Sequence, residues 1–562
     1  MRSIASHGRT AGGTLPSGGA VDALPAASVF PTRAAIVIAL LAVALRLWFW
    51  FYTGRTWEDA LITVQHAENA ARGLGLTHTP QAGPPLHGFT SPLSVLIPLA
   101  GEFLHAGFGL PLLKLLSALL GGVSAWLGIR IAYRLELAPA FVILVGGFLA
   151  IEHHQILYGM AGMETQVTVT ILLFSFYTMF RFNPKLVGLA LGLSMLVRPD
   201  FAFWVAIALA LAAWRCWRRR DSKPLLTILA ALLMVYGPWL IFTTWYYGSP
   251  VPNTILAKAY GYDNRWYLGL SPSQFWSALL DRLRLAIFGP LGLTFGGHGT
   301  GFWPFPSPFP NQEPVFWLML SLIPVGCFRA WLKRDLASLG ICGFVAVYSL
   351  YYMFGMTLVF GWYVEPLTAA AILACACGAD LLLRARPLAP IAPLAAAGFT
   401  VAYLFLHAML LPISFRADRN IQEFVENGNR KVMAEYLAGV TSANQTIGCE
   451  PLGYIGYYSR RIVFDYPGLC NRKVTQFMRE HRQDHSLLGM LKAFQPDYVV
   501  LRPRELPVGE AGNWLRDGYD SVREFRVPEA QVREIFLSQH NFDLVYFVFK
   551  RKPGAVSPSL VK

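Results

Sequence analysis

Charged residues are scarce in this sequence, and several signatures of soluble enzymes are missing. Only 14% of the 562 residues are charged, while 54% are hydrophobic, a balance that soluble proteins of this length rarely keep. No P-loop, no G-x-S-x-G elbow and no Rossmann fingerprint occurs. The sequence therefore gives no support to a nucleotide-driven mechanism, and it predicts a polytopic membrane protein.

Cysteine is also rare, and the basic residues form no stripe. The seven cysteines show no zinc-site spacing, although Cys449 and Cys470 fall in a polar region where a disulfide stays an open alternative. The net charge of +14 comes from Arg and Lys at the ends of apolar runs, without interleaved aromatics. We therefore expect membrane lipids and no nucleic acid as partners, and interpret the charges as positive-inside topology signals.

Long apolar runs fill most of the chain up to residue 413. About eleven suit membrane helices, several of them short against the roughly 20 residues that cross a bilayer. These runs are 33–53, 111–132, 137–153, 166–181, 186–198, 200–214, 225–246, 314–332, 336–358, 364–383 and 388–413. The basic segments 215–223, 329–335 and 384–386 then share the cytoplasmic side, provided that 91–104 is an interfacial or re-entrant segment.

Composition also predicts the domain organisation. Residues 1–32 are expected to form a disordered cytoplasmic N-terminus, and 551–562 a disordered tail. Between them we expect a transmembrane domain, 33–414, with outer loops 54–110 and 247–313, and a soluble domain, 415–550, whose "DYVVLRP" and "FDLVYFVFKR" alternate like strands. The predicted fold class is mainly α, a polytopic α-helical membrane protein with a small C-terminal soluble α/β domain outside the membrane.

An acidic pair, Glu58 and Asp59, directly follows the first apolar run. A helix is expected from Asp59 until Gly73 and Gly75, with Asp59 and His66 on one face. One interpretation is that the pair complements the positive end of the helix dipole. The other is that a carboxylate held at the membrane surface acts as a general base on an acceptor hydroxyl.

Other outer segments carry ionisable groups that are costly inside a membrane unless they face a cavity or a partner. Glu164 lies in "YGMAGMETQ", and Arg198 and Asp200 lie in "LVRPDF". A structural ion pair of Arg198 with Asp200 or Glu164 is one interpretation of these residues. In "YGSPVPNTILAKAYG", Asn253 precedes Lys258, which either snorkels or holds a phosphate as a point charge.

Aromatic and histidine residues leave similar alternatives. Tyr363, in "FGWYVEPL", suits either an interfacial aromatic belt or a substrate contact. His66, His78 and His87 have no strong metal-ligand spacing, so hydrogen-bonded or solvated histidines are the simpler interpretation.

The order of several motifs along the chain resembles a known class. "EDALIT…HAENAARGLGL", "GFTSPL", "GMET", "RPDF", "YGSPVPNT…AK" and "GYIGYYSRRIVFDYPGL", over about residues 33–505, resemble the polytopic GT-C glycosyltransferases that use polyprenyl-phosphate sugars. The nearest likeness is the branch of actinobacterial cell-wall arabinofuranosyltransferases. Each motif alone is weak, but their order is specific.

The resemblance implies a function and a site. It implies transfer of a pentose such as arabinofuranose, or of a hexose, from a polyprenyl-phosphate donor to a cell-envelope glycan, lipid or protein acceptor. The implied base is Asp59, with Glu58 as a supporting carboxylate where many relatives have a second aspartate, and Arg198 and Lys258 bind the donor phosphate. The expected substrate-binding residues are His66, Glu164, Asp200, Asn253 and Tyr363.

Some questions stay open at this level. No cofactor is implied with certainty, and a divalent Mg²⁺ or Mn²⁺ on Glu58, Asp59 and Glu164 is an alternative to basic residues alone. A lipid-linked-sugar transporter or flippase and a non-catalytic envelope scaffold are the competing functions. The expected location is the bacterial inner (plasma) membrane, with the active site and C-terminal domain on the periplasmic side.

Overall fold

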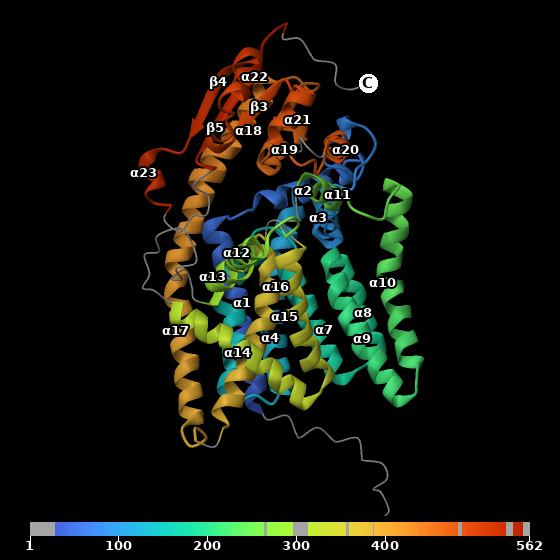
Figure 1. The fold of residues 1–562 in the computed structure, drawn as a ribbon, viewed down its shortest axis with the longest axis vertical. Helices are drawn as coiled ribbons and strands as arrows, with labels where there is room; N and C mark the ends of the chain where they lie inside the picture. The colour runs from blue at the N-terminus through green and yellow to red at the C-terminus, as the bar shows by residue number, and fades with distance from the viewer. Residues whose placement is uncertain are drawn as a thin grey trace, which may run out of the picture.

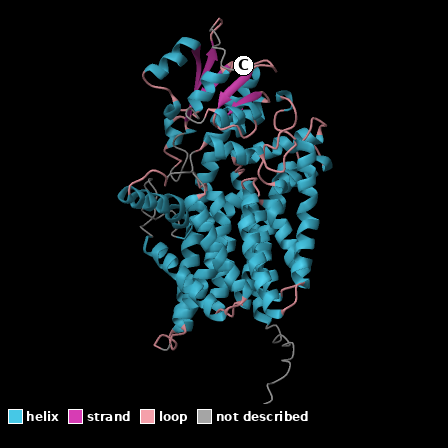
Figure 2. Cartoon of the chain, turned by 45° about the vertical axis from the view of Figure 1, so that its right-hand side comes forward, coloured by secondary structure: helices cyan, strands magenta, loops and turns pink. Residues whose placement is uncertain are grey.

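The chain forms a long helical bundle with a small sheet at one end (Figure 1, Figure 2). This computed structural model describes residues 29–262, 267–295, 313–355, 359–385, 387–481, 486–535 and 543–554. The predicted fold class is confirmed, because a polytopic helical bundle is joined to a small C-terminal sheet.

Each of the eleven predicted apolar runs corresponds to a helix of the bundle. These helices are α1 (Val29–Thr53), α4 (Gly109–Arg134), α5 (Pro139–Ile151), α7 (Thr165–Arg181), α8 (Pro184–Val197), α9 (Ala202–Arg219), α10 (Lys223–Tyr247), α14 (Glu313–Lys333), α15 (Leu336–Phe354), α16 (Gly361–Leu383) and α17 (Ala392–Asn420). Among the described residues, eight helices are long and apolar enough to cross a membrane, or nine if one bent pair is a single span.

The bent pair is α5 followed by α6 (His153–Met160), which meet at an angle of 42°. Glu152 caps α6 by accepting a hydrogen bond from the Gln155 amide at 2.7 Å. Arg46 of α1 donates to the carbonyls of Leu149 (3.1 Å) and Ala150 (3.4 Å), which the break leaves without helical partners. The bend is therefore stabilised inside the bundle by side chains that satisfy its free backbone groups.

The basic connections gather at the end of the bundle away from the sheet (Figure 1). Asp380 of α16 is paired with Arg329 of α14 at 3.2 Å and with Arg384 at 2.8 Å. Lys333 pairs with Glu136, in the turn between α4 and α5. These contacts put the segments 329–335 and 384–385 beside each other, as the charge pattern predicts.

Short helices fill the opposite end of the bundle, below the sheet. They are α2 (Glu58–Ala71), η1 (Pro80–Ala82), α3 (Pro92–Leu104), η2 (Pro199–Phe201), α11 (Asn253–Gly261), α12 (Pro272–Leu283), η3 (Arg284–Phe288) and α13 (Gly289–Phe295). The run 91–104, excluded from the predicted spans, is α3, and Ser91 caps it by accepting a hydrogen bond from the Ser94 amide. It packs against α2 and α4.

The C-terminal part surrounds a five-stranded mixed sheet. Its elements are η4 (Ile421–Lys431), α18 (Val432–Val440), β1 (Thr446–Cys449), α19 (Leu452–Ser459), β2 (Ile462–Asp465), α20 (Arg472–Glu480), α21 (Leu487–Phe494), β3 (Tyr498–Leu501), η5 (Pro503–Glu505), α22 (Glu510–Gly518), β4 (Tyr519–Arg526), α23 (Glu529–Val532) and β5 (Val545–Arg551). The strand order is β2-β1-β3-β5-β4, with β1 parallel to β2 and β3, and β5 antiparallel to β3 and β4. The strands expected in "DYVVLRP" and "FDLVYFVFKR" are β3 and β5.

Other sequence expectations meet the structure only in part. The expected disordered ends lie mostly outside the described residues, since α1 begins at Val29 and β5 ends at Arg551. The outer loop 247–313 also lies partly outside them. Cys449 and Cys470 are both free and buried, so the disulfide left open by the sequence is not formed.

Candidate active site

The acidic pair lies where α1 ends and α2 begins, below the C-terminal sheet. Gly54 follows α1 with a φ of 62°, a left-handed conformation that favours glycine and turns the chain sharply. The Trp57 amide then donates to the carbonyl of Ala161 at 2.9 Å, and the Trp57 ring packs edge-on against Trp362. These contacts place the first turn of α2 beside the last turn of α6 and the first turn of α16.

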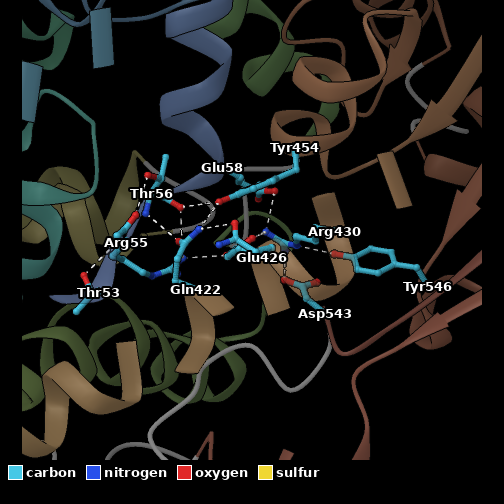
Figure 3. Close-up of polar contacts among 12 residues, drawn as sticks. Thr53, Arg55, Thr56, Glu58, Gln422, Glu426, Arg430, Tyr454, Asp543 and Tyr546 are labelled. Carbon is cyan, nitrogen blue, oxygen red and sulfur yellow. Dashed lines mark hydrogen bonds and ion pairs between the residues drawn. The ribbon is translucent and has the colours of Figure 1, made fainter. Parts of the chain in front are cut away.

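Glu58 is engaged by the C-terminal part of the chain. Its carboxylate lies 3.1 Å from the guanidinium of Arg430, which also binds Glu426, Asp543 and Tyr546 (Figure 3). Burial raises the pKa of Glu58 to about 8, while the positive charge of Arg430 acts in the opposite direction. Glu58 is therefore already bound to a cation and is poorly placed to accept a proton from a substrate.

Asp59 is different, although it is the next residue. Within the described part of the chain its carboxylate makes no hydrogen bond or ion pair, and its side chain is partly exposed. Burial raises the pKa of Asp59, and the charges of Lys258 and Arg430 oppose that rise. Asp59 thus keeps free acceptor oxygens, which a side chain needs in order to accept a proton.

Arg198 and Asp200 form the ion pair that was one of the two interpretations of the sequence. Two parallel hydrogen bonds join them, Nε to Oδ1 at 2.9 Å and Nη2 to Oδ2 at 2.7 Å. The guanidinium also lies over the Tyr363 ring, 4.4 Å from its centroid. Tyr348 donates to the backbone carbonyl of Asp200 at 2.8 Å, so this turn has a fixed position.

Tyr363 brings the two predicted phosphate-binding cations together. Lys258 of α11 donates to the Tyr363 hydroxyl at 3.1 Å, and Arg198 stacks on the ring of the same residue. Burial by itself would lower the pKa of Lys258, but Tyr363 and Asp59 together raise it above the ordinary value. Lys258 is therefore a cation at neutral pH, with Asp59 among the charges that stabilise it.

Glu164 lies at the N-terminal end of α7 and shares this electrostatic environment. Burial raises its pKa, the charge of Arg198 opposes the rise, and Asp59 adds to it. Among the described residues, no three His, Cys, Asp or Glu side chains come together around a point that a metal ion could occupy. The carboxylates of Glu58, Asp59 and Glu164 therefore do not converge on one point as the three-carboxylate metal site considered from the sequence would require.

Two of the predicted substrate-binding residues have other contacts. His66 is fully buried, with Nδ1 2.8 Å from the Ile62 carbonyl and its ring edge-on to Phe89. Asn253 donates from its amide nitrogen to the carbonyl of Gly468 and to the hydroxyl of Thr475. His66 stabilises α2 internally, and Asn253 ties α11 to the C-terminal part.

Sequence reasoning did not single out the residues that hold the start of α2. Gln422, Glu426 and Arg430 follow one another at intervals of four, and this spacing alone signals a shared polar helix face. Asp543, the partner of Arg430, gave no signal in the sequence, because it comes from a distant segment.

Comparisons with known proteins bear on the fold. ArnT from Cupriavidus metallidurans in the apo state aligns with a TM-score of 0.54 and 12% identity, covering 92% of this chain and 98% of that protein. The fold is that of the GT-C membrane glycosyltransferases. The same ArnT bound to undecaprenyl phosphate aligns with a TM-score of 0.49, 12% identity and coverage of 93% and 97%. Arabinofuranosyltransferase AftD from Mycobacteria gives 0.35 and 15% identity, over 88% of this chain and 37% of AftD.

Sequence comparison adds one family and no characterised relative. Residues 419–545 match a family described as a domain of unknown function (DUF8728). No curated protein matches the chain. The likeness to solved GT-C structures therefore rests on three-dimensional arrangement, and it establishes the fold alone.

Proposed function

We propose that the protein is a membrane glycosyltransferase that moves a sugar from a polyprenyl-phosphate donor to a cell-envelope acceptor. The observation that carries this proposal is the grouping of a free carboxylate, Asp59, with two cations, Arg198 and Lys258, that share Tyr363. The GT-C fold and the undecaprenyl phosphate bound by ArnT support a lipid-linked donor.

The proposed reaction is a displacement at the anomeric carbon of the donor sugar. The acceptor hydroxyl oxygen forms the new bond to that carbon, and its proton passes to Asp59. The bond from the anomeric carbon to the phosphate oxygen breaks, and the lipid phosphate leaves with the electron pair. Arg198 and Lys258 stabilise the charge that grows on the phosphate, as preorganised cations do in other transferases.

An apolar cavity of about 300 Å³ supports a lipid-linked donor. It lies among α13, α14, α15 and α16, and its lining includes Ser349 and Leu367. Leu367 is one helical turn from Tyr363 along α16, and Ser349 lies between Tyr348 and Tyr352 on α15. A phosphate bound at Tyr363 would thus have an apolar space within reach for the first isoprene units.

We further propose a bacterial plasma membrane location with the site on the outer face, and a pentose such as arabinofuranose or a hexose as the transferred sugar. The motif order "EDALIT", "GMET", "RPDF" and "YGSPVPNT…AK" supports the arabinofuranosyltransferase branch. The position of the basic connections at the opposite end of the bundle supports the orientation. The domain boundaries expected near residues 33, 415 and 551 are part of the same proposal.

A transfer assay tests the proposal. Purified protein in liposomes is supplied with a panel of radiolabelled polyprenyl-phosphate sugars and with glycan acceptors, and labelled product is measured. We expect labelled product from the wild type, and a loss of at least about 10²-fold in rate for Asp59→Asn at unchanged folded yield. Full transfer by Asp59→Asn would reject Asp59 as the base. Passage of the lipid-linked sugar across the bilayer without transfer would favour the flippase alternative, and neither activity would favour the scaffold.

A further inference from the structure

The polypeptide just before Asp59 is anchored from one side by the C-terminal part of the chain. The backbone amide of Thr56 donates to the side-chain oxygen of Gln422 at 2.9 Å, and Tyr454 donates to the Thr56 carbonyl at 3.2 Å. Arg55 lies 3.1 Å from Glu426. Figure 3 shows these side chains in one connected network that includes Glu58 and runs on through Arg430 to Tyr546.

Arg430 is the centre of that network. It is buried and uses its three nitrogens on different partners, with Nη1 on Glu58 and Glu426, Nη2 on Asp543, and Nε on the Tyr546 hydroxyl at 2.8 Å. A planar guanidinium held this way has one orientation, which a flexible ammonium would not have. The only partner of Arg430 outside the C-terminal part, among the described residues, is Glu58.

We infer that Arg430 is a positioning residue, which fixes Asp59 by holding its neighbour Glu58 and so makes the C-terminal domain part of the active site. This inference rests on the proposed glycosyltransferase function for its kinetic consequences. Residues that touch Glu58, Thr56 and Arg55 from this side belong to the segment 419–545 that matches the family of unknown function. The inference therefore assigns that domain a role in catalysis.

Position matters here because Asp59 makes no fixing contact of its own within the described residues. Small misplacements of a catalytic group lower rates strongly, up to about 10²-fold for 1 Å. Arg430 has a second effect on the same carboxylate, since its charge opposes the burial that raises the pKa of Asp59. Loss of Arg430 is thus expected to change both the place of Asp59 and the pH at which it is free to accept a proton.

The kinetic test compares Arg430→Gln, Arg430→Lys and Glu58→Gln with the wild type. For Arg430→Gln we expect kcat to fall on the order of ten- to a hundredfold, donor KM to stay within about twofold, and the acidic limb of the kcat profile to move to higher pH. Arg430→Lys should restore the pH profile but not the full kcat. The double variant Arg430→Gln with Glu58→Gln should have the same kcat as Arg430→Gln alone, because each change removes the same contact between Glu58 and Arg430.

The matched control is Arg419→Gln. Arg419 lies on the same helical segment, half exposed, and its partner Glu423 at 3.7 Å is exposed too. Its replacement should leave kcat and the pH profile unchanged. An Arg430→Gln variant whose activity falls only in proportion to the folded fraction, with an unchanged pH profile, would overturn the inference.

Amide hydrogen exchange tests the inference without any turnover. Exchange of residues 55–62 should rise at least about tenfold in Arg430→Gln and in Glu58→Gln, whereas β3, at Tyr498–Leu501, should keep its wild-type protection. Equal opening of β3 and 55–62 in both variants, or no opening in either, would contradict the inference. If the wild type transfers no sugar but the two variants show the expected rise in exchange at residues 55–62, the proposed function is rejected and the positioning role of Arg430 is kept.

Discussion

Two neighbouring carboxylates illustrate how partners decide the role of a residue. Glu58 and Asp59 have similar chemistry, but Glu58 lies 3.1 Å from Arg430 while Asp59 has no bonded partner among the described side chains. The resemblance implies Asp59 as the base and Glu58 as a supporting carboxylate, a choice that rests on the family pattern and not on the two residues themselves. In the structure the difference between them depends on Arg430, which no local pattern around residue 58 reveals.

Replacement of Lys258 by Met tests the cationic field around Asp59. Burial raises the pKa of Asp59, and Lys258 is the first of the charges that lower it again. Removal of this charge should raise the pKa further, so the carboxylate stays protonated to a higher pH and the acidic limb of kcat shifts upward. Donor KM should rise on the order of tenfold, since the proposed contact of Lys258 with the donor phosphate is lost as well. The dependence of kcat on pH, recorded at saturating donor, measures the shift. An unchanged acidic limb in Lys258→Met would show that the charge of Lys258 does not affect the pKa of Asp59.

His87 gives a stability prediction at the same scale. Burial lowers its pKa to about 3, both ring nitrogens lack a partner among the described residues, and the ring stacks on Tyr247 at 4.8 Å. Unfolded His87 binds a proton near pH 6.5, whereas the folded residue does not, so its contribution favours unfolding progressively as the pH falls below 6.5. His87→Phe should therefore match the wild type at pH 8 and melt at a higher temperature at pH 5.

The exposed His105 supplies the control for this measurement. His105→Phe should leave the difference in melting temperature between pH 8 and pH 5 unchanged. If the melting temperature falls equally between pH 8 and pH 5 in the wild type and in His87→Phe, groups other than His87 determine that fall.

At the scale of elements, the helices follow from composition, but their partners do not. Apolar runs near the length of a membrane crossing predict α1, α4 and α10, because no other structure satisfies the backbone in lipid. The bend between α5 and α6 is not visible in the sequence, since it depends on Arg46 reaching carbonyls more than a hundred positions away. The pairing of β5 between β3 and β4 is equally non-local.

The cavity among α13, α14, α15 and α16 allows a test at this scale. Ser349→Phe on α15 fills part of the roughly 300 Å³ next to Tyr352. We expect donor KM to rise about tenfold for a long polyprenyl chain and little for a one-isoprene donor, because only the long chain needs the space. Ala346→Phe is the matched control, on the exposed face of the same helix. An equal effect on both donors would place the lipid elsewhere.

At the scale of the whole molecule, the site joins segments that are widely separated in the sequence. The bundle supplies Arg198 and Tyr363, the short helices α2 and α11 supply Asp59 and Lys258, and the C-terminal part contacts Glu58 at the start of α2. Such a site is only partly predictable, since charges at helix ends can be found locally but their convergence depends on the complete fold. Asn253, which stays a predicted substrate-binding residue, also connects α11 to Gly468.

The link between Glu58 and Arg430 also sets an order in biosynthesis, because 372 positions separate the two residues. During translation, residues 55–59 emerge from the ribosome long before Arg430, and Asp543 follows later still. Until β5 has joined the sheet, Arg430 lacks its partner Tyr546, and the group that holds Glu58 is incomplete. A nascent or truncated chain therefore lacks the contact at Glu58, and the last described strand to emerge from the ribosome is the one that completes it.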